Sequence, residues 1–259
     1  MDCPVEFVEF AKLLARESGD LIRPYFGRPD LRVDAKEDAS PVTEADRRAE
    51  ELMRTMIGDR YPEHGILGEE FGEEQPDAEW VWTLDPIDGT ISFAAGCPLF
   101  GTLISVQQRG VPVLGLIHNP VLGQLCVGTE AGTTLDGRPT RVRETRSLSD
   151  AVLLATDVAS VAAYRKESGA TGFEELRLRA RLFRTWGDCS GYVLLVSGGA
   201  DIMLDPIMNT WDLHPLIPIV RGAGGVITSW SGEDPVGADS CVACGPALHA
   251  QVLEALAPV

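Results

Sequence analysis

One stretch of the chain, residues 81–104, constrains the fold more than any other. It begins with an apolar run at residues 81–84 that is typical of a buried strand. The hexapeptide DPIDGT follows directly at residues 85–90. We therefore expect two carboxylates, Asp85 and Asp88, at the end of a strand.

Gly89 and Thr90 make the same place suitable for an anion. A glycine allows close approach by a ligand, and Thr90 can open a helix whose free N–H groups receive an anion. Since carboxylates also bind hard divalent cations, the hexapeptide is suited to a metal-bound phosphate. The alternative is an ordinary turn at Asp88-Gly89 that only ends the strand.

The composition excludes several classes of partner. With 259 residues and 44% hydrophobic side chains, the chain can bury a sizeable core. Its net charge of -17 argues against nucleic acid or an anionic membrane surface as a partner. An anionic small-molecule substrate must then be attracted by bound cations and backbone dipoles.

The N-terminus predicts a cytoplasmic protein, and that compartment in turn predicts the state of the cysteines. The first ten residues lack the pattern of a secretory signal, and no apolar stretch has membrane-spanning length. In a reducing compartment the six cysteines should be free thiols. Cys241 and Cys244 form a C-x-x-C that could be half a zinc site with His249. Because a second ligand pair is missing, buried structural thiols on a strand are favoured.

The pattern of elements predicts two halves without a linker. In residues 1–148 we expect an α+β half that carries most metal ligands, with helices at 6–26 and 44–57 and an antiparallel meander over 101–128. Between them, a short apolar strand that begins at Ile66 should deliver Glu69 and Glu70 into a loop. In residues 149–259 strands and helices alternate, which indicates an α/β half that carries Asp212 and a substrate-specificity segment. The halves should share a site at their interface.

Further acids stand at the ends of apolar segments, each with a structural alternative. Glu69 follows a short strand, as Asp85 does. Asp46 lies three residues after Thr43, so it could complete a capping box. Asp212 precedes an apolar helix and could cap it, or it could point into the central cleft.

Three motifs in this order resemble the inositol monophosphatase family of lithium-sensitive, magnesium-dependent phosphatases. They are Glu69-Glu70 after a glycine, DPIDGT at 85–90, and Trp211-Asp212 before a helix that ends in GAGG at 222–225. The resemblance runs the length of the chain. It implies an α/β (α+β) fold, a layered α-β-α-β-α sandwich of the inositol monophosphatase and fructose bisphosphatase type, and a homodimer.

The resemblance also implies roles for individual residues. Asp46 and Thr90, with Glu69, would be catalytic, because Asp46 and Thr90 match the pair that orients an attacking water. The Gly89 and Thr90 amides match phosphate contacts. Two or three Mg²⁺ ions would be held by five ligands: Glu69, Asp85, the Ile87 carbonyl, Asp88 and Asp212. The implied reaction is hydrolysis of a phosphate monoester by direct attack of a metal-activated water.

Elementary electrostatics points to the same metal. Clustered carboxylates raise one another's pKa unless cations neutralise them. All the expected ligands are hard oxygens, which favours magnesium. Lys36 and Asp38 could help close over a third metal, but solvated loop charges are the favoured interpretation.

Within the family, residues 184–192 and 200–225 most resemble the histidinol-phosphate phosphatase branch. The expected substrate contacts are Asp88, Asp188 and Asp205. Asp188 could pair with the ammonium or imidazolium of histidinol phosphate, or it could cap a helix.

Two alternatives remain open. One is another phosphatase of the family, acting on inositol phosphate, fructose bisphosphate or a nucleotide phosphate. The other is a catalytically inactive binding protein of the same fold, which would not need a water-orienting threonine. A nucleophilic cysteine has no support, because no phosphate-cradling loop follows any cysteine.

Overall fold

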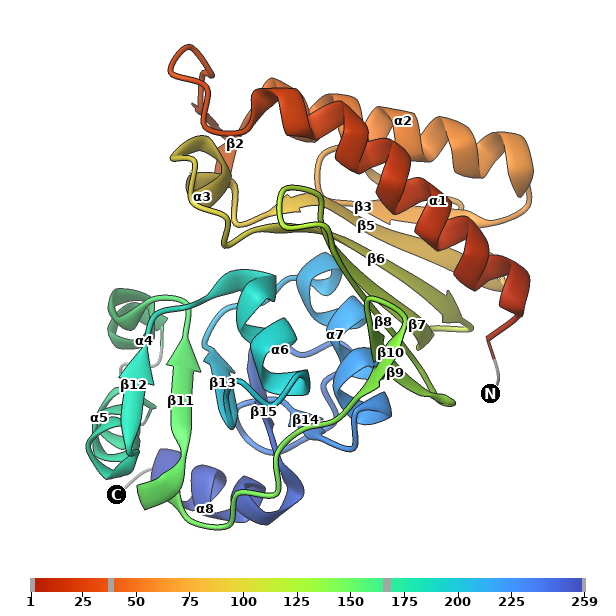
Figure 1. The fold of residues 1–259 in the computed structure, drawn as a ribbon. Coiled ribbons are helices and arrows are strands. Elements are labelled where there is room, and N and C mark those ends of the chain that lie inside the picture. Colours follow the sequence, from red (N-terminus) through yellow and green to blue (C-terminus); the bar gives the residue numbers. More distant parts are fainter. Residues whose placement is uncertain (1–2, 37–39, 165–168, 258–259) are drawn as a thin grey trace.

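The computed structural model describes residues 3–36, 40–164 and 169–257, and it stacks helices and sheets in the order α-β-α-β-α (Figure 1). Helices α1 (Val5–Ile22) and α2 (Glu44–Arg60) form the first layer. They cover an eight-stranded sheet whose other face packs against α7 (Thr210–Gly222) and α6 (Asp188–Val196). A five-stranded sheet follows, and the remaining long helices cover its outer face. The predicted layered fold is confirmed.

The eight-stranded sheet places two acidic strand ends side by side. Its strands are β3 (Gly65–Gly68), β4 (Gly72–Glu74), β5 (Trp80–Asp88), β6 (Gly101–Gln108), β7 (Val111–Asn119), β8 (Gln124–Thr129), β9 (Gly132–Leu135) and β10 (Arg138–Thr140). They lie in the order β10-β9-β8-β7-β6-β5-β3-β4. β3 and β5 run parallel with Gly68 opposite Leu84, so Glu69 and Asp85 leave neighbouring positions.

The second sheet is mixed, in the order β12-β11-β13-β15-β14. Its strands are β11 (Val152–Ala155), β12 (Leu182–Arg184), β13 (Ile202–Asp205), β14 (Val226–Thr228) and β15 (Cys241–Cys244). The remaining helices of this half are α4 (Val158–Tyr164), α5 (Gly169–Arg179) and α8 (Pro246–Leu256). Short elements elsewhere are β1 (Asp34–Ala35), β2 (Pro41–Val42), α3 (Thr90–Ala94) and the 3₁₀ turns Arg23–Tyr25 and Leu148–Asp150. None of the described helices has the length and apolarity needed to cross a membrane.

Most elements match the sequence predictions within a few residues. The meander of β6, β7 and β8 is antiparallel, as predicted. In the second half the sequence pattern also predicts a helix at 159–167, and the corresponding α4 is described from Val158 to Tyr164. Cys241 and Cys244 are buried free thiols in clusters on opposite faces of β15, so they cannot bind one metal ion together. The division of the chain at residue 148 stays a prediction.

Close packing of α7 on the meander fixes the position of this helix. Gly115 of β7 and Gly128 of β8 are cross-strand partners beneath it. A Cβ atom at Gly115 would lie 1.8 Å from the Pro215 carbonyl oxygen, and one at Gly128 would lie 2.3 Å from the Ile219 Cα. The helix backbone can therefore approach the sheet only because both positions lack a side chain.

Gly115→Ala should consequently destabilise the protein by about 1–3 kcal/mol, because overpacking forces α7 away from the sheet. The free energy of unfolding from urea titrations measures the effect. Gly58→Ala is the matched control, since a Cβ there meets no atom within 4 Å. It should be neutral or stabilise α2 by up to about 1 kcal/mol. Equal effects of the two substitutions would contradict this packing.

Candidate metal centre and substrate pocket

Three carboxylates converge between β5 and α7. Asp85 and Asp88 lie on β5, and Asp212 lies in the first turn of α7. One carboxylate oxygen of each lies within 4.8 Å of those of the other two. All three donors are hard carboxylate oxygens, so the cluster could hold a metal ion and fits magnesium. The structure thus brings together three of the five predicted ligands in one cluster, and a fourth, Glu69, lies within hydrogen-bonding reach of Asp85.

The backbone around these acids is irregular. β5 continues through Asp88, and its pairing with β6 shifts between Asp85 and Asp88. Asp85 and Asp88 therefore lie at the end of a strand, as predicted, and the strand continues through Pro86, which is tolerated at such an irregularity. The Ile87 N–H donates to Asp85 Oδ1 at 3.0 Å, and the Ile87 carbonyl accepts a hydrogen bond from Thr90 Oγ1 at 3.1 Å.

Burial and repulsion by neighbouring carboxylates raise the pKa of each acid in the cluster. Burial is the main cause for Asp85, whose pKa lies well above its usual range, and the charges of Glu69, Asp88 and Asp212 add to it. The pKa of Asp88 is raised in the same way, by burial and then by Asp188 and Asp212. The pKa of Asp212 rises to about 7, again mainly through burial. A divalent cation would remove this repulsion.

Glu69 and Glu70 share the ammonium group of Lys36. Lys36 Nζ lies 2.7 Å from Glu69 Oε1 and 2.7 Å from Glu70 Oε1, and its side chain is only 19% exposed. The favoured interpretation of Lys36 as a solvated loop charge is therefore wrong, since its ammonium group pairs with both acids. Asp38 lies outside the described residues.

Asp46 caps a helix and also lies beside Thr90, the two features considered from the sequence. Its Oδ2 accepts hydrogen bonds from the backbone N–H and the hydroxyl of Thr43, which completes the predicted capping box of α2. Its Oδ1 faces Thr90 Oγ1 at 3.5 Å. Burial is the main cause that raises the pKa of Asp46 to about 6. One carboxylate thus caps a helix and contacts the threonine.

Asp212 caps α7, whereas Asp188 does not cap α6. Asn209 is the N-cap of α7, and Asp212 accepts the Asn209 N–H at 2.8 Å from the third helical position, which completes a capping box. Gly187 is the N-cap of α6, and Asp188 is the first helical residue, with φ +50°. Both carboxylates remain available to face the cleft between the sheets.

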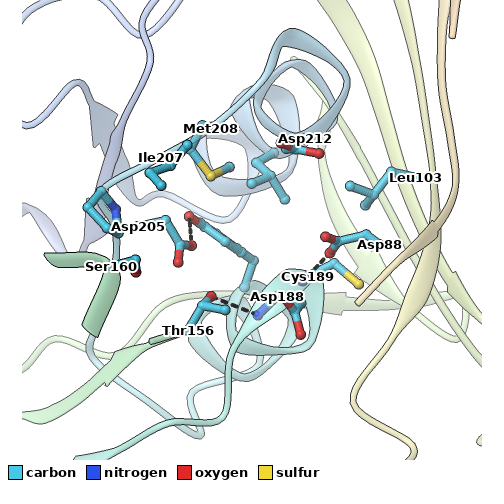
Figure 2. Close-up of a pocket in the computed structure, with 13 residues that line it drawn as sticks. Asp88, Leu103, Thr156, Ser160, Asp188, Cys189, Asp205, Ile207, Met208 and Asp212 are labelled. Carbon is cyan, nitrogen blue, oxygen red and sulfur yellow. Dashed lines mark hydrogen bonds between the residues drawn. The ribbon is translucent and has the colours of Figure 1, made fainter. Parts of the chain in front are cut away.

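A cavity of about 230 Å³ adjoins the cluster and is lined by four aspartates, Asp88, Asp188, Asp205 and Asp212 (Figure 2). Asp205 is buried and accepts a hydrogen bond from the Tyr192 hydroxyl at 2.7 Å. Burial and the charge of Asp205 raise the pKa of Asp188 to about 7. The cavity is therefore acidic and suits a ligand with positive charge.

Gly89 lies where the cavity meets the cluster. Its φ is +86°, and a Cβ there would lie 2.8 Å from the Leu99 carbonyl oxygen and 3.0 Å from Asp188 Oδ2. Protein atoms thus approach Gly89 closely, and close approach by a ligand stays a prediction. The Asp188 carboxylate sits beside the predicted phosphate contacts at Gly89 and Thr90.

Sequence reasoning missed several residues that hold these acids in place. Thr156 Oγ1 accepts the Asp188 N–H at 2.9 Å, although the two residues are 32 positions apart. Tyr192 is likewise distant from Asp205. Glu50 accepts the Glu70 N–H and so supports the turn beside Glu69. Of these residues, Glu50 alone has a pattern visible in the sequence, because it lies four residues after Asp46 and four before Arg54, on one face of α2.

Asp212→Asn should change the pH dependence of stability in metal-free buffer. The folded-state pKa of Asp212, about 7, exceeds its ordinary value of 3.8. Ionisation of Asp212 therefore opposes folding increasingly as the pH rises from about 4 to about 7. An asparagine can still accept the Asn209 N–H. The variant should therefore gain stability relative to the wild type as the pH rises. The difference in free energy of unfolding, variant minus wild type, should be larger at about pH 8 than at about pH 5 by about 1 kcal/mol or more. Denaturant titrations with EDTA measure it, and a difference independent of pH would contradict the raised pKa.

Comparisons with known proteins cover the whole site. A sequence model of the inositol monophosphatase family matches residues 4–259. The histidinol-phosphatase of Chlorobaculum parvum is 38% identical over 231 residues, 88% of each chain. That of Mycobacterium tuberculosis is 35% identical over 250 residues, 95% of this chain and 96% of its own. The structure of an inositol monophosphatase from Zymomonas mobilis superimposes with a TM-score of 0.88, at 36% identity and 99% coverage of both chains. The chain therefore belongs to the inositol monophosphatase family, and it is a phosphatase.

Proposed function

We propose that this phosphatase uses magnesium to hydrolyse histidinol phosphate. The observation that carries the proposal is the convergence of Asp85, Asp88 and Asp212 beside an acidic cavity. The carboxylates provide the oxygen ligands that magnesium prefers, and the cavity provides negative charge where a cationic alcohol would lie. Two relatives with the name histidinol-phosphatase support the choice of substrate.

Magnesium, when bound, supplies positive charge that acidifies water and stabilises the leaving oxygen. Glu69 and the Ile87 carbonyl would complete the set of ligands for two or three ions. Asp46 and Thr90 would hold the attacking water, because a threonine hydroxyl can donate to Asp46 and accept from water at the same time. With its pKa at about 6, Asp46 is mostly ionised at neutral pH and can take part as an acceptor.

The position of Asp188 supports an aminated substrate. Its carboxylate lies beside Gly89, whose amide and that of Thr90 would hold the phosphate. In histidinol phosphate the ammonium stands on the carbon next to the ester carbon, so it would lie close to the phosphate and within reach of Asp188. Asp205, fixed by Tyr192, would face the imidazole end.

The remaining parts of the proposal rest on the family. We expect a homodimer in the cytoplasm that serves histidine biosynthesis. Hydrolysis of inositol phosphate is the second candidate, because the Zymomonas mobilis structure is of an inositol monophosphatase. An inactive binding protein would not need Asp46 and Thr90 in contact.

A side-by-side substrate panel tests the proposal. With Mg²⁺, phosphate release should be faster from histidinol phosphate than from inositol phosphate. Asp188→Asn should raise the KM for histidinol phosphate by about 10-fold, since it removes one charge-assisted hydrogen bond. It should change the KM for inositol phosphate much less, because inositol phosphate has no cationic group. Initial rates of phosphate release provide the measurement.

Asp88→Asn and Thr90→Ala are the matched inactive variants. Each should lower kcat by at least about 100-fold on both substrates, because they remove a ligand and a water-orienting group. A preference for inositol phosphate would refute the substrate assignment. Absence of Mg²⁺-dependent release from every ester in the panel would refute the proposed function.

A further inference from the structure

The turn that carries Glu69 is held by all three of its backbone N–H groups. Residues 69–71 join β3 to β4, and Gly68 pairs with Gly72 across the turn. The Glu69 N–H donates to the Leu84 carbonyl at 3.1 Å, next to Asp85. The other two N–H groups, of Glu70 and Phe71, donate to the Glu50 carboxylate at 2.7 and 3.1 Å. Glu69 therefore projects from a backbone with little freedom.

Glu50 is a fully buried carboxylate of α2 that the proposed chemistry does not use. Arg54, one helical turn on, pairs with it at 2.8 Å and also donates to the Gly72 carbonyl. A Cβ at Gly68 would lie 1.9 Å from Glu50 Oε1, so the strand end is packed directly on this carboxylate. A buried charge with this many partners is costly to disturb.

We propose that Glu50 is a positioning residue for metal binding, because its carboxylate and Arg54 clamp the turn that presents Glu69 to the aspartate cluster. The inference rests on the proposed function in one respect, that Glu69 is a metal ligand. Groups that orient a ligand from behind contribute to metal affinity although they do not touch the ion. Glu50 is such a group, since it binds the backbone on either side of the Glu70 Cα.

The same helix ties this turn to the water-orienting pair. Asp46 lies in the first turn of α2, four residues before Glu50, so both side chains leave one face of the helix. Asp46 contacts Thr90, and Glu50 contacts the Glu69 turn. α2 therefore sets the spacing between the two groups that flank the metal cluster.

Glu50→Gln tests the proposal without changing side-chain size. A glutamine can accept from only one oxygen, and its NH₂ group must face another donor, so the clamp loses a hydrogen bond. In isothermal titration calorimetry with Mn²⁺ alone and no substrate, the Kd should increase by about 10- to 100-fold. The Mg²⁺ concentration that gives half-maximal activity should rise by a similar factor, while the rate at saturating Mg²⁺ should change less.

Met53→Ala is the control for lost stability. Met53 is fully buried on α2 but packs in the apolar cluster between the helices and the sheet. It should lower the melting temperature and leave the Mn²⁺ Kd unchanged. An unchanged Kd in folded Glu50→Gln, or an equal change in Met53→Ala, would overturn the proposal.

Arg54→Lys serves if Glu50→Gln does not fold. It keeps a cation beside Glu50 but loses the fork that also reaches Gly72, so the Kd should rise by a smaller factor; an unchanged value would overturn the proposal. Absence of Mn²⁺ binding to the wild type would contradict the proposed function, and the inference with it. Normal binding to the wild type and to both Glu50→Gln and Arg54→Lys would refute the inference alone.

Discussion

Repulsion between carboxylates that are buried side by side is the constraint on which the site depends. Burial is the main cause that raises the pKa of Asp85, Asp88 and Asp212, and the charges of neighbouring carboxylates raise it further. Each of the three accepts one backbone N–H, from Ile87, Cys189 and Asn209 respectively. These hydrogen bonds offset part of the cost of burial. They leave a concentration of negative charge that a divalent cation would neutralise.

Two helices, α7 and α2, position these acids through close contacts with the first sheet. α7 packs against the first sheet through positions without side chains and also contacts β14 of the second sheet. It therefore carries Asp212 to β5 from the distant end of the chain. α2 supports the other side, where Glu50 holds the Glu69 turn and Asp46 meets Thr90. α7 and α2 therefore both pack against the sheet and position the acids of the site.

The sequence predicted those parts of the site that depend on local spacing. The capping box of Asp46 was visible because its partner lies three residues away, and DPIDGT identified the acids of β5. The pairing of Lys36 with Glu69 and of Tyr192 with Asp205 was not visible, because tertiary packing brings these residues together. The continuation of β5 through Pro86 was not visible, because proline usually breaks a strand and is tolerated here at an irregularity in the pairing.

Glu50 shows why a residue that supports a site without contacting the ligand is hard to predict from sequence. In sequence it is one of several acids on a charged helix, and such acids are usually solvated. Its burial follows from the turn that closes over it, 20 residues further along the chain. The substrate pocket is equally hard to predict, because the packing of α6 against β6 brings Asp188 close to Gly89.

We propose that Asp85 and Asp88 of β5 and Asp212 of α7 form one metal site. Anomalous diffraction from crystals grown with Mn²⁺ tests it most directly. We expect a peak about 2.1 Å from carboxylate oxygens of Asp85, Asp88 and Asp212. A protein that binds Mn²⁺ only elsewhere, or shows no ordered ion at saturating Mn²⁺, would contradict the claim.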